Sequence, residues 1–214
     1  DVSADDGLLQ GGLEIDDSST LTSLDLSGVK TIDGNFILIG QGTLASFSAP
    51  DLTEVKGEII IGSQGDDEGN AKLASITFPV LEKVLSKFQV SSNAELTNVS
   101  SSKLETIGGE LKIDSCANLS TIDLPLLSTS RGIYVSSNDA LAQLSLPSLT
   151  SNTAGLTVKE NENLIDISLD KLTQSIGSDD SNLGLAITDN AKLVTIGLTS
   201  MQNCSDSNCT GDFG

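Results

Sequence analysis

Two acidic segments contain the residue types that could support chemistry. Asp66, Asp67 and Glu68 lie in a Gly-Asp-Asp-Glu-Gly segment, and Asp179 and Asp180 form a second pair. Carboxylate oxygens on a turn are ligands for Ca²⁺, and two carboxylates at a suitable separation hydrolyse glycosidic bonds. The first segment lacks the alternating ligands of an EF-hand loop, and 30 acidic residues make adjacent pairs common by chance. We interpret both segments as solvated loops and keep the first as the only metal-site candidate.

Histidine is absent from the sequence. Ser-His-Asp triads, Cys-His pairs and histidine-containing zinc sites all require it, so most hydrolytic mechanisms are excluded. The Gly-Gly pairs at 11–12 and 108–109 precede expected strands rather than helices, so they lack the amide cluster that binds phosphate. The sequence therefore predicts a protein that is not an enzyme and uses no cofactor.

Sequons and cysteines indicate the compartment. Asn-X-Ser/Thr sequons begin at Asn98, Asn118, Asn203 and Asn208. Such sequons accept N-glycans in secreted proteins. In an oxidising compartment we expect Cys204 and Cys209, which lie close together, to form a disulfide that caps one end of the fold. These features favour a secreted, extracellular protein of the cell surface or cell wall.

Composition excludes several partners. The net charge of −19 repels nucleic acid phosphates and anionic lipid headgroups. No apolar run approaches the roughly 18 residues of a membrane-spanning helix, and residues 1–6 lack the basic and apolar regions of a signal peptide, so we expect any such peptide to have been removed. Aromatic residues make up only 3% of the chain, which predicts a narrow interior filled by branched aliphatic side chains alone.

A leucine recurs along the chain at nearly constant spacing. The eight anchor positions are Leu21, Leu44, Leu73, Leu96, Leu119, Leu141, Leu164 and Leu193. Five of the seven intervals are 22 or 23 residues, and the other two are 29, which is the basic unit plus six. Between Ile61 and Leu73 the usual interval of six residues becomes 12, so an insertion lies there. A fixed period of this length indicates a repeat architecture.

Within each unit, apolar and polar residues alternate, as in Leu-Ala-Gln-Leu-Ser-Leu (141–146). A period of two predicts short strands of three to five residues. Pro50, Pro79, Pro125 and Pro147 follow the first strand of their units, and a proline cannot donate to a strand ladder, so it predicts a corner. Stacked coils would align the inward residues into aliphatic columns. The sequence predicts an all-β solenoid of about eight to nine coils with a repeat of roughly 23 residues.

A polar column accompanies the aliphatic ones. Equivalent places after the second strand are occupied by Asn93, Cys116, Asn138, Asn161 and Asn190. An inward asparagine can satisfy backbone donors and acceptors at a corner and stack into a ladder. The leucine-rich-repeat consensus allows Asn or Cys at such a place, so we interpret Cys116 as a buried structural residue.

The segments Leu-Thr-Ser-Leu-Asp-Leu (21–26), Leu-Glu-Thr-Ile-Gly-Gly-Glu-Leu-Lys-Ile (104–113) and Leu-Ala-Gln-Leu-Ser-Leu-Pro-Ser-Leu-Thr-Ser (141–151) resemble the receptor L-domain superfamily. They are most similar to GPI-anchored fungal cell-wall proteins of the sporulation-specific and extracellular-mutant type. The resemblance covers residues 11 to about 200. It implies a right-handed solenoid displayed outside the cell. We expect one domain over 1–214, with an N-terminal cap and partial coil in 1–20, repeats in 21–200 and a Cys-containing cap in 201–214.

Two outward faces are predicted. The first strands should present small polar side chains such as Ser46, Ser48 and Thr121. The second strands should present Ile37, Ile60 and Tyr134, which could form an apolar contact patch.

These faces predict a non-catalytic protein that recognises a protein or glycan partner at the cell surface and does not insert into a membrane. One alternative is ice binding by the flat polar face. Another is self-assembly of the open ends of the solenoid into extracellular filaments.

Overall fold

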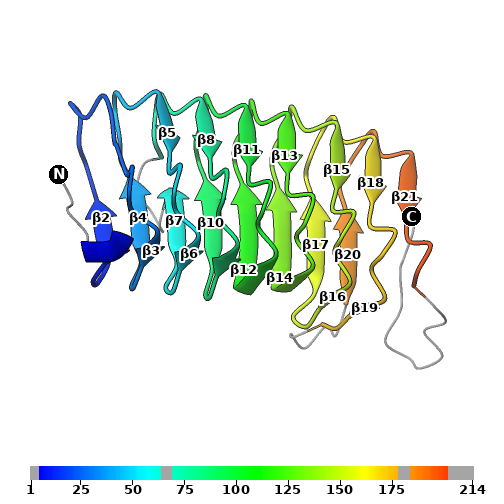
Figure 1. The fold of residues 1–214 in the computed structure, drawn as a ribbon. Helices are drawn as coiled ribbons and strands as arrows, with labels where there is room; N and C mark the ends of the chain where they lie inside the picture. Colours follow the sequence, from blue (N-terminus) through cyan, green and yellow to red (C-terminus); the bar gives the residue numbers. More distant parts are fainter. Residues whose placement is uncertain (1–4, 64–68, 178–183, 202–214) are drawn as a thin grey trace.

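The chain folds as a β-solenoid of about seven turns with a spacing of roughly 23 residues (Figure 1). The structure, a computed structural model, describes residues 5–63, 69–177 and 184–201. Every strand pair in these ranges is parallel, which confirms the all-β, stacked-coil prediction. The number of turns, about seven, is slightly lower than the predicted eight to nine coils.

The longest face of the solenoid is formed by the second strand of each coil. From the N-terminal end, these strands are β2 (Leu13–Ile15), β4 (Phe36–Ile39), β7 (Ile59–Gly62), β10 (Phe88–Ser91), β12 (Thr106–Asp114), β14 (Thr129–Ser136), β17 (Leu156–Lys159) and β20 (Leu185–Thr188). Equivalent residues pair along the stack, as Ile61 does with Val90 and Val90 with Ile113. Each coil therefore repeats the register of the one before it.

A short third strand, which the sequence did not predict, precedes the second strand in most coils. These strands are β1 (Leu8–Leu9), β3 (Thr31–Ile32), β6 (Glu54–Val55), β9 (Lys83–Val84), β16 (Ser151–Asn152) and β19 (Gln174–Ser175), and a 3-10 turn, η1 (Asp5–Gly7), lies before β1. In β12 and β14 the third and second strands are continuous, which gives those two strands nine and eight residues. They exceed the predicted three to five residues.

The first strands of the coils form two separate sheets. One contains β5 (Ser46–Ser48), β8 (Ser75–Thr77), β11 (Asn98–Ser100) and β13 (Thr121–Asp123), and the other contains β15 (Gln143–Ser145), β18 (Asp166–Ser168) and β21 (Thr195–Gly197). Pro50, Pro125 and Pro147 lie in the turns that follow these strands. The hydrogen-bonded pairing of the first strands is therefore interrupted between β13 and β15, although the two strands lie side by side (Figure 1).

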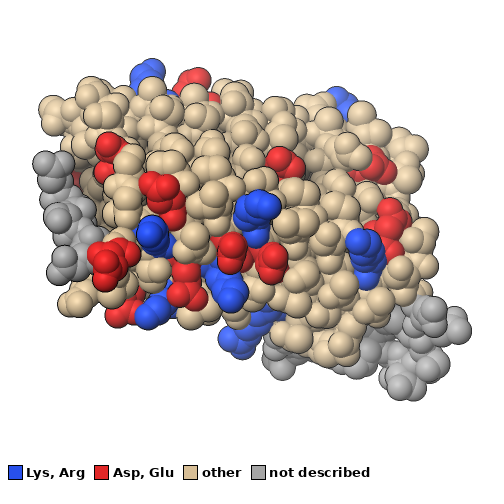
Figure 2. Space-filling model, viewed as in Figure 1, with Lys and Arg blue, Asp and Glu red and all other residues tan. Residues whose placement is uncertain are grey.

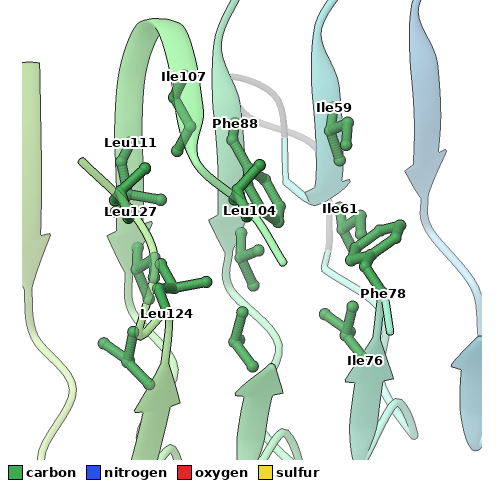
Figure 3. Close-up of a cluster of buried hydrophobic side chains, with 14 of the residues drawn as sticks. Ile59, Ile61, Ile76, Phe78, Phe88, Leu104, Ile107, Leu111, Leu124 and Leu127 are labelled. Carbon is green, nitrogen blue, oxygen red and sulfur yellow. The ribbon is translucent and has the colours of Figure 1, made fainter. Parts of the chain in front are cut away.

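One cluster of buried apolar residues runs through the coils from Leu26 to Leu172. Figure 3 shows part of it, with Ile59, Ile61 and Phe88 from the long sheet and Ile76 from a first strand pointing into the same interior. Each inward residue lies on its counterpart in the next coil, so the apolar surface of one coil is buried only by its neighbours.

Four phenylalanines correct the expectation of a purely aliphatic interior. The ring centroids of Phe36 and Phe47 lie 5.2 Å apart, those of Phe47 and Phe78 lie 5.6 Å apart, and those of Phe78 and Phe88 lie 5.8 Å apart. All four side chains are buried. Tilted and edge-to-face contacts of this kind contribute about 0.5–1.5 kcal/mol beyond area burial. The N-terminal coils are therefore wide enough for aromatic rings.

Candidate binding surfaces

A ladder of polar side chains runs along one corner of the coils. Asn93, Asn138 and Asn161 are fully buried. The Asn138 Oδ1 accepts a hydrogen bond from the backbone N–H of Cys116 at 3.2 Å, and the Asn161 Oδ1 accepts one from the backbone N–H of Asn138 at 3.1 Å. The Asn190 Oδ1 accepts from Asn161 in the same way at 3.1 Å. The predicted polar column therefore lies at a corner of the solenoid, where its hydrogen bonds connect successive coils.

Two further residues belong to the ladder but were missed in the sequence. Asn70 donates through its backbone N–H to the Asn93 Oδ1 at 3.3 Å, and the backbone N–H of Gln41 donates to the Asn70 Oδ1 at 3.0 Å. Both precede an anchor, Leu73 or Leu44, by three residues, as Asn93 precedes Leu96. Counting back from the anchors would have identified them. The insertion concealed Asn70, because it separates this residue from its second strand.

Cys116 replaces an asparagine in the middle of the ladder. Its side chain is buried, and the Sγ donates to the backbone carbonyl of Asp114 at 3.4 Å. Burial raises the pKa of the Cys116 thiol to about 11. A thiol with a pKa that high carries little thiolate near neutral pH, so it is a structural group rather than a nucleophile.

A non-glycine residue with left-handed backbone precedes each of the five ladder positions that directly follow a second strand. Ser92, Ser115, Ser137, Glu160 and Asp189 all have φ of 55 or 56°. Non-glycine residues reach this region at a cost of about 1–2 kcal/mol. The hydrogen bonds of the ladder residue that follows hold the corner in this conformation.

The faces of the first strands present small polar side chains. Ser46, Ser48, Thr121 and Asp123 are exposed. In Figure 2 charged side chains are scattered over the upper half of the visible face, level with β5, β8, β11 and β13 in Figure 1, whereas acidic and basic side chains lie close together in the lower half.

At the N-terminal end of this polar face lies a shallow groove of about 320 Å³. It is lined by Thr22, Ser23, Leu24, Asp25, Ser27, Ser46, Ser48 and Pro50. Hydrogen bonds from the Ser27 hydroxyl and backbone N–H lower the pKa of Asp25, so this carboxylate stays ionised in the groove.

Burial contradicts the predicted apolar contact patch. Ile37 and Ile60 are adjacent on the outward side of the long sheet, as alternation predicts, but they are only 9% and 2% exposed. With Ile39 they form a small second cluster outside the main core. Beside Ile60 in the sheet, Gln89 is also buried and donates to the Ser63 carbonyl at 2.6 Å, where the chain leaves the repeat for its insertion. The isoleucines therefore stabilise the fold and present no open surface.

Tyr134, the third residue of that predicted patch, lies apart from the two isoleucines. It occupies the middle of β14, between Lys112 on β12 and Thr157 on β17. The Nζ atoms of Lys112 and Lys159 lie 5.8 and 6.0 Å from its ring centroid. The structure therefore separates Tyr134 from Ile37 and Ile60 and places it among charged groups.

The two described sequons differ in their accessibility. Asn98 lies in β11, and its Oδ1 is buried without a hydrogen-bond partner among the described residues. Asn118 is exposed in a turn that is closed by a 2.9 Å hydrogen bond from the Leu119 N–H to the Cys116 carbonyl. Asn118 is therefore the better acceptor for a glycan.

Several predicted sites lie outside the described residues. They are Asp66, Asp67, Glu68, Asp179, Asp180, Asn203, Cys204, Asn208 and Cys209. Within the described ranges there is no cluster of three or more acidic, cysteine or histidine side chains that could hold a metal ion. The same ranges contain no helix with the length and apolar character needed to cross a bilayer.

Comparisons with known proteins found no match to any family model, to curated proteins or to solved structures.

Proposed function

We propose that this chain is a non-catalytic recognition protein of the cell surface or extracellular space, which binds a protein or glycan partner through a face of its solenoid. The in-register strand array supports this proposal best. Because each coil repeats the register of the last, the array holds rows of outward side chains at fixed spacing on a rigid support. A preorganised surface loses little conformational entropy on binding.

The extracellular assignment rests on the sequence. Its support is the sequon at the exposed Asn118 and the resemblance of the repeats to the receptor L-domain superfamily. We propose membership of that superfamily on the same residues. A solenoid alone does not determine a ligand, so the partner has to be identified by binding measurements.

The test combines binding arrays with variants of each face. Purified protein is applied to glycan and extracellular-protein arrays, and saturable binding to a defined partner is expected. Ser46→Arg places a bulky charge on the first-strand face, and Thr157→Arg does the same on the second-strand face. Loss of binding in one variant alone identifies the face. Electron micrographs that show fibres, together with silent arrays, would instead favour self-assembly.

Ice binding is the weaker candidate. It requires a flat face with regular hydroxyl rows, whereas strand pairing on the first-strand face is interrupted between β13 and β15 and its outward residues mix Ser, Thr, Asp, Asn and Gln. A thermal-hysteresis measurement at millimolar protein concentration tests it directly, and we expect no activity.

A further inference from the structure

Tyr134 is the one described aromatic residue outside the core. The phenylalanines at 36, 47, 78 and 88 belong to the buried cluster, whereas the Tyr134 side chain projects from the outer side of β14 and is partly exposed. β14 pairs on both sides, with seven residue pairs to β12 and four to β17. The ring therefore stands on the most extensively paired part of the sheet.

Two ion pairs surround this ring. The Lys112 Nζ lies 3.5 Å from the Asp114 Oδ1, and the Lys159 Nζ lies 3.4 Å from the Glu160 Oε1. The lysine side chains are only 30% and 33% exposed. Tyr134 and, after it, Glu160 raise the pKa of Lys159, which keeps its ammonium group charged. Both lysines are thus held beside the ring before any ligand arrives.

The charges at this site cancel. Two ammonium groups face two carboxylates, in a chain whose net charge is −19. An anionic ligand gains little from such a site and is repelled by the protein as a whole. The neighbours of Tyr134 across and along the strands are Lys112, Thr157, Gly132 and the buried Ser136. The ring is therefore an isolated apolar group and is not part of the apolar centre with several anchors that is typical of a protein interface.

A neutral sugar matches the remaining chemistry. Its C–H face packs against an aromatic ring, and its hydroxyl groups both donate and accept hydrogen bonds. The site offers one ring, two ammonium donors and two carboxylate acceptors within one patch, and hydrogen bonds to charged partners are the stronger kind. Specific small-ligand sites combine an apolar surface with a few fixed polar groups in the same way.

We propose that Tyr134, with the Lys112–Asp114 and Lys159–Glu160 ion pairs, binds a neutral glycan. This inference rests on the proposed recognition function and assigns it a partner class and a face.

The sequence provides a specific reporter for this site. The chain contains one tyrosine and no tryptophan, so its ultraviolet-excited emission comes almost entirely from Tyr134. The full chain is titrated with laminarin, mannan and xyloglucan as neutral probes, and with alginate and dextran sulfate as anionic probes. We expect a saturable change in tyrosine emission with at least one neutral probe and none with the anionic probes. Affinity electrophoresis in the same polysaccharides gives an independent affinity.

Three variants complete the test. Tyr134→Ala should weaken binding in electrophoresis by about tenfold or more, which corresponds to about 1.4 kcal/mol. Tyr134→Phe keeps the ring and should bind within about threefold of the wild type. Thr121→Ala, on the exposed β13 face, is the matched control and should bind normally. Urea unfolding midpoints show whether each variant is folded.

The outcomes separate this inference from the broader proposal. If electrophoresis shows unchanged neutral-glycan binding by Tyr134→Ala, and the tyrosine emission of the wild type does not respond to the glycan, the site at Tyr134 is overturned. The broader recognition function then still stands. Binding only to the anionic probes overturns the neutral-sugar assignment. Silence with every polysaccharide, alongside a protein hit on the arrays, overturns the glycan inference alone. Silence on both arrays contradicts the recognition function as well.

Discussion

Replacing Asn138 by alanine should destabilise the solenoid far more than any exposed substitution. The Asn138 Oδ1 accepts from the Cys116 N–H at 3.2 Å, and its Nδ2 donates to the Ile113 carbonyl at 3.0 Å. All three residues are fully buried. Alanine removes both partners, and each buried group left unpaired costs about 1–3 kcal/mol. We therefore expect a loss of about 3 kcal/mol in the free energy of unfolding.

Equilibrium urea unfolding measures this loss. The matched control is Asn118→Ala, which removes an exposed asparagine two residues beyond Cys116 and should change stability by less than about 0.5 kcal/mol. The slope of the transition must stay constant, because stacked coils can lose cooperativity. Equal midpoints for the two variants would refute the idea that the ladder joins the coils.

The ladder also predicts a stabilising change. The backbone N–H and the side chain of Asn93 lie beside the Cys116 sulfur, where other coils provide an amide oxygen. Cys116→Asn should restore that acceptor and raise the unfolding free energy by about 1 kcal/mol. A loss of stability in the same urea assay would show that the corner has no room for the larger side chain.

Three further predictions concern the corner and the buried isoleucines. Ser115→Gly removes the backbone strain of a non-glycine residue held at φ 56° and should raise the unfolding free energy by about 1 kcal/mol. The urea midpoint measures this change, and a decrease would contradict the strain argument. Burial raises the pKa of Cys116 from 9.0 to about 11, so on raising the pH the unfolded chain loses the thiol proton before the folded chain does. The free energy of unfolding therefore keeps its full value below pH 9 and falls by about 2–3 kcal/mol as the pH rises to 11. Stability measured at pH 8, 9, 10 and 11 should show that loss in the wild type relative to Cys116→Ser, and parallel curves would exclude it. Ile60→Asp buries an unpaired carboxylate and should cost on the order of 3 kcal/mol, which lowers the thermal midpoint by about 6–12 °C. A normal midpoint would show that Ile60 is accessible to solvent.

Periodicity predicted most of the fold because the solenoid is built from one repeated unit. Leu96, Leu119 and Leu141 are all buried, one per coil, as their spacing requires. The Asn138 and Asn161 positions could be recognised for the same reason. Strand lengths could not be predicted as well, because the third strand was not recognised, and in β12 and β14 it continues without interruption into the second strand.

Exposure was harder to predict than orientation. Alternation correctly assigned Ile37 and Ile60 to the outward side of their strands. It carries no information about what covers that side, and both residues are buried. Tyr134 also follows the alternation. Lys159, which lies diagonally across the sheet from it, belongs to the next coil, so the contact between this lysine and the ring can be predicted only once the strand register is known.

Disulfide trapping between neighbouring coils tests the stacked register most directly. Ser46 of β5 pairs with Ser75 of β8 across the 29-residue interval that contains the first insertion. Paired positions in neighbouring strands lie about 5 Å apart, which a disulfide spans, whereas a position two residues further along is about 8 Å away and out of reach. In a Cys116→Ser background, Ser46→Cys/Ser75→Cys should cross-link on mild oxidation, and Ser46→Cys/Thr77→Cys should not. Equal cross-linking of the two pairs, or preference for the second, would contradict the register on which every surface described above depends.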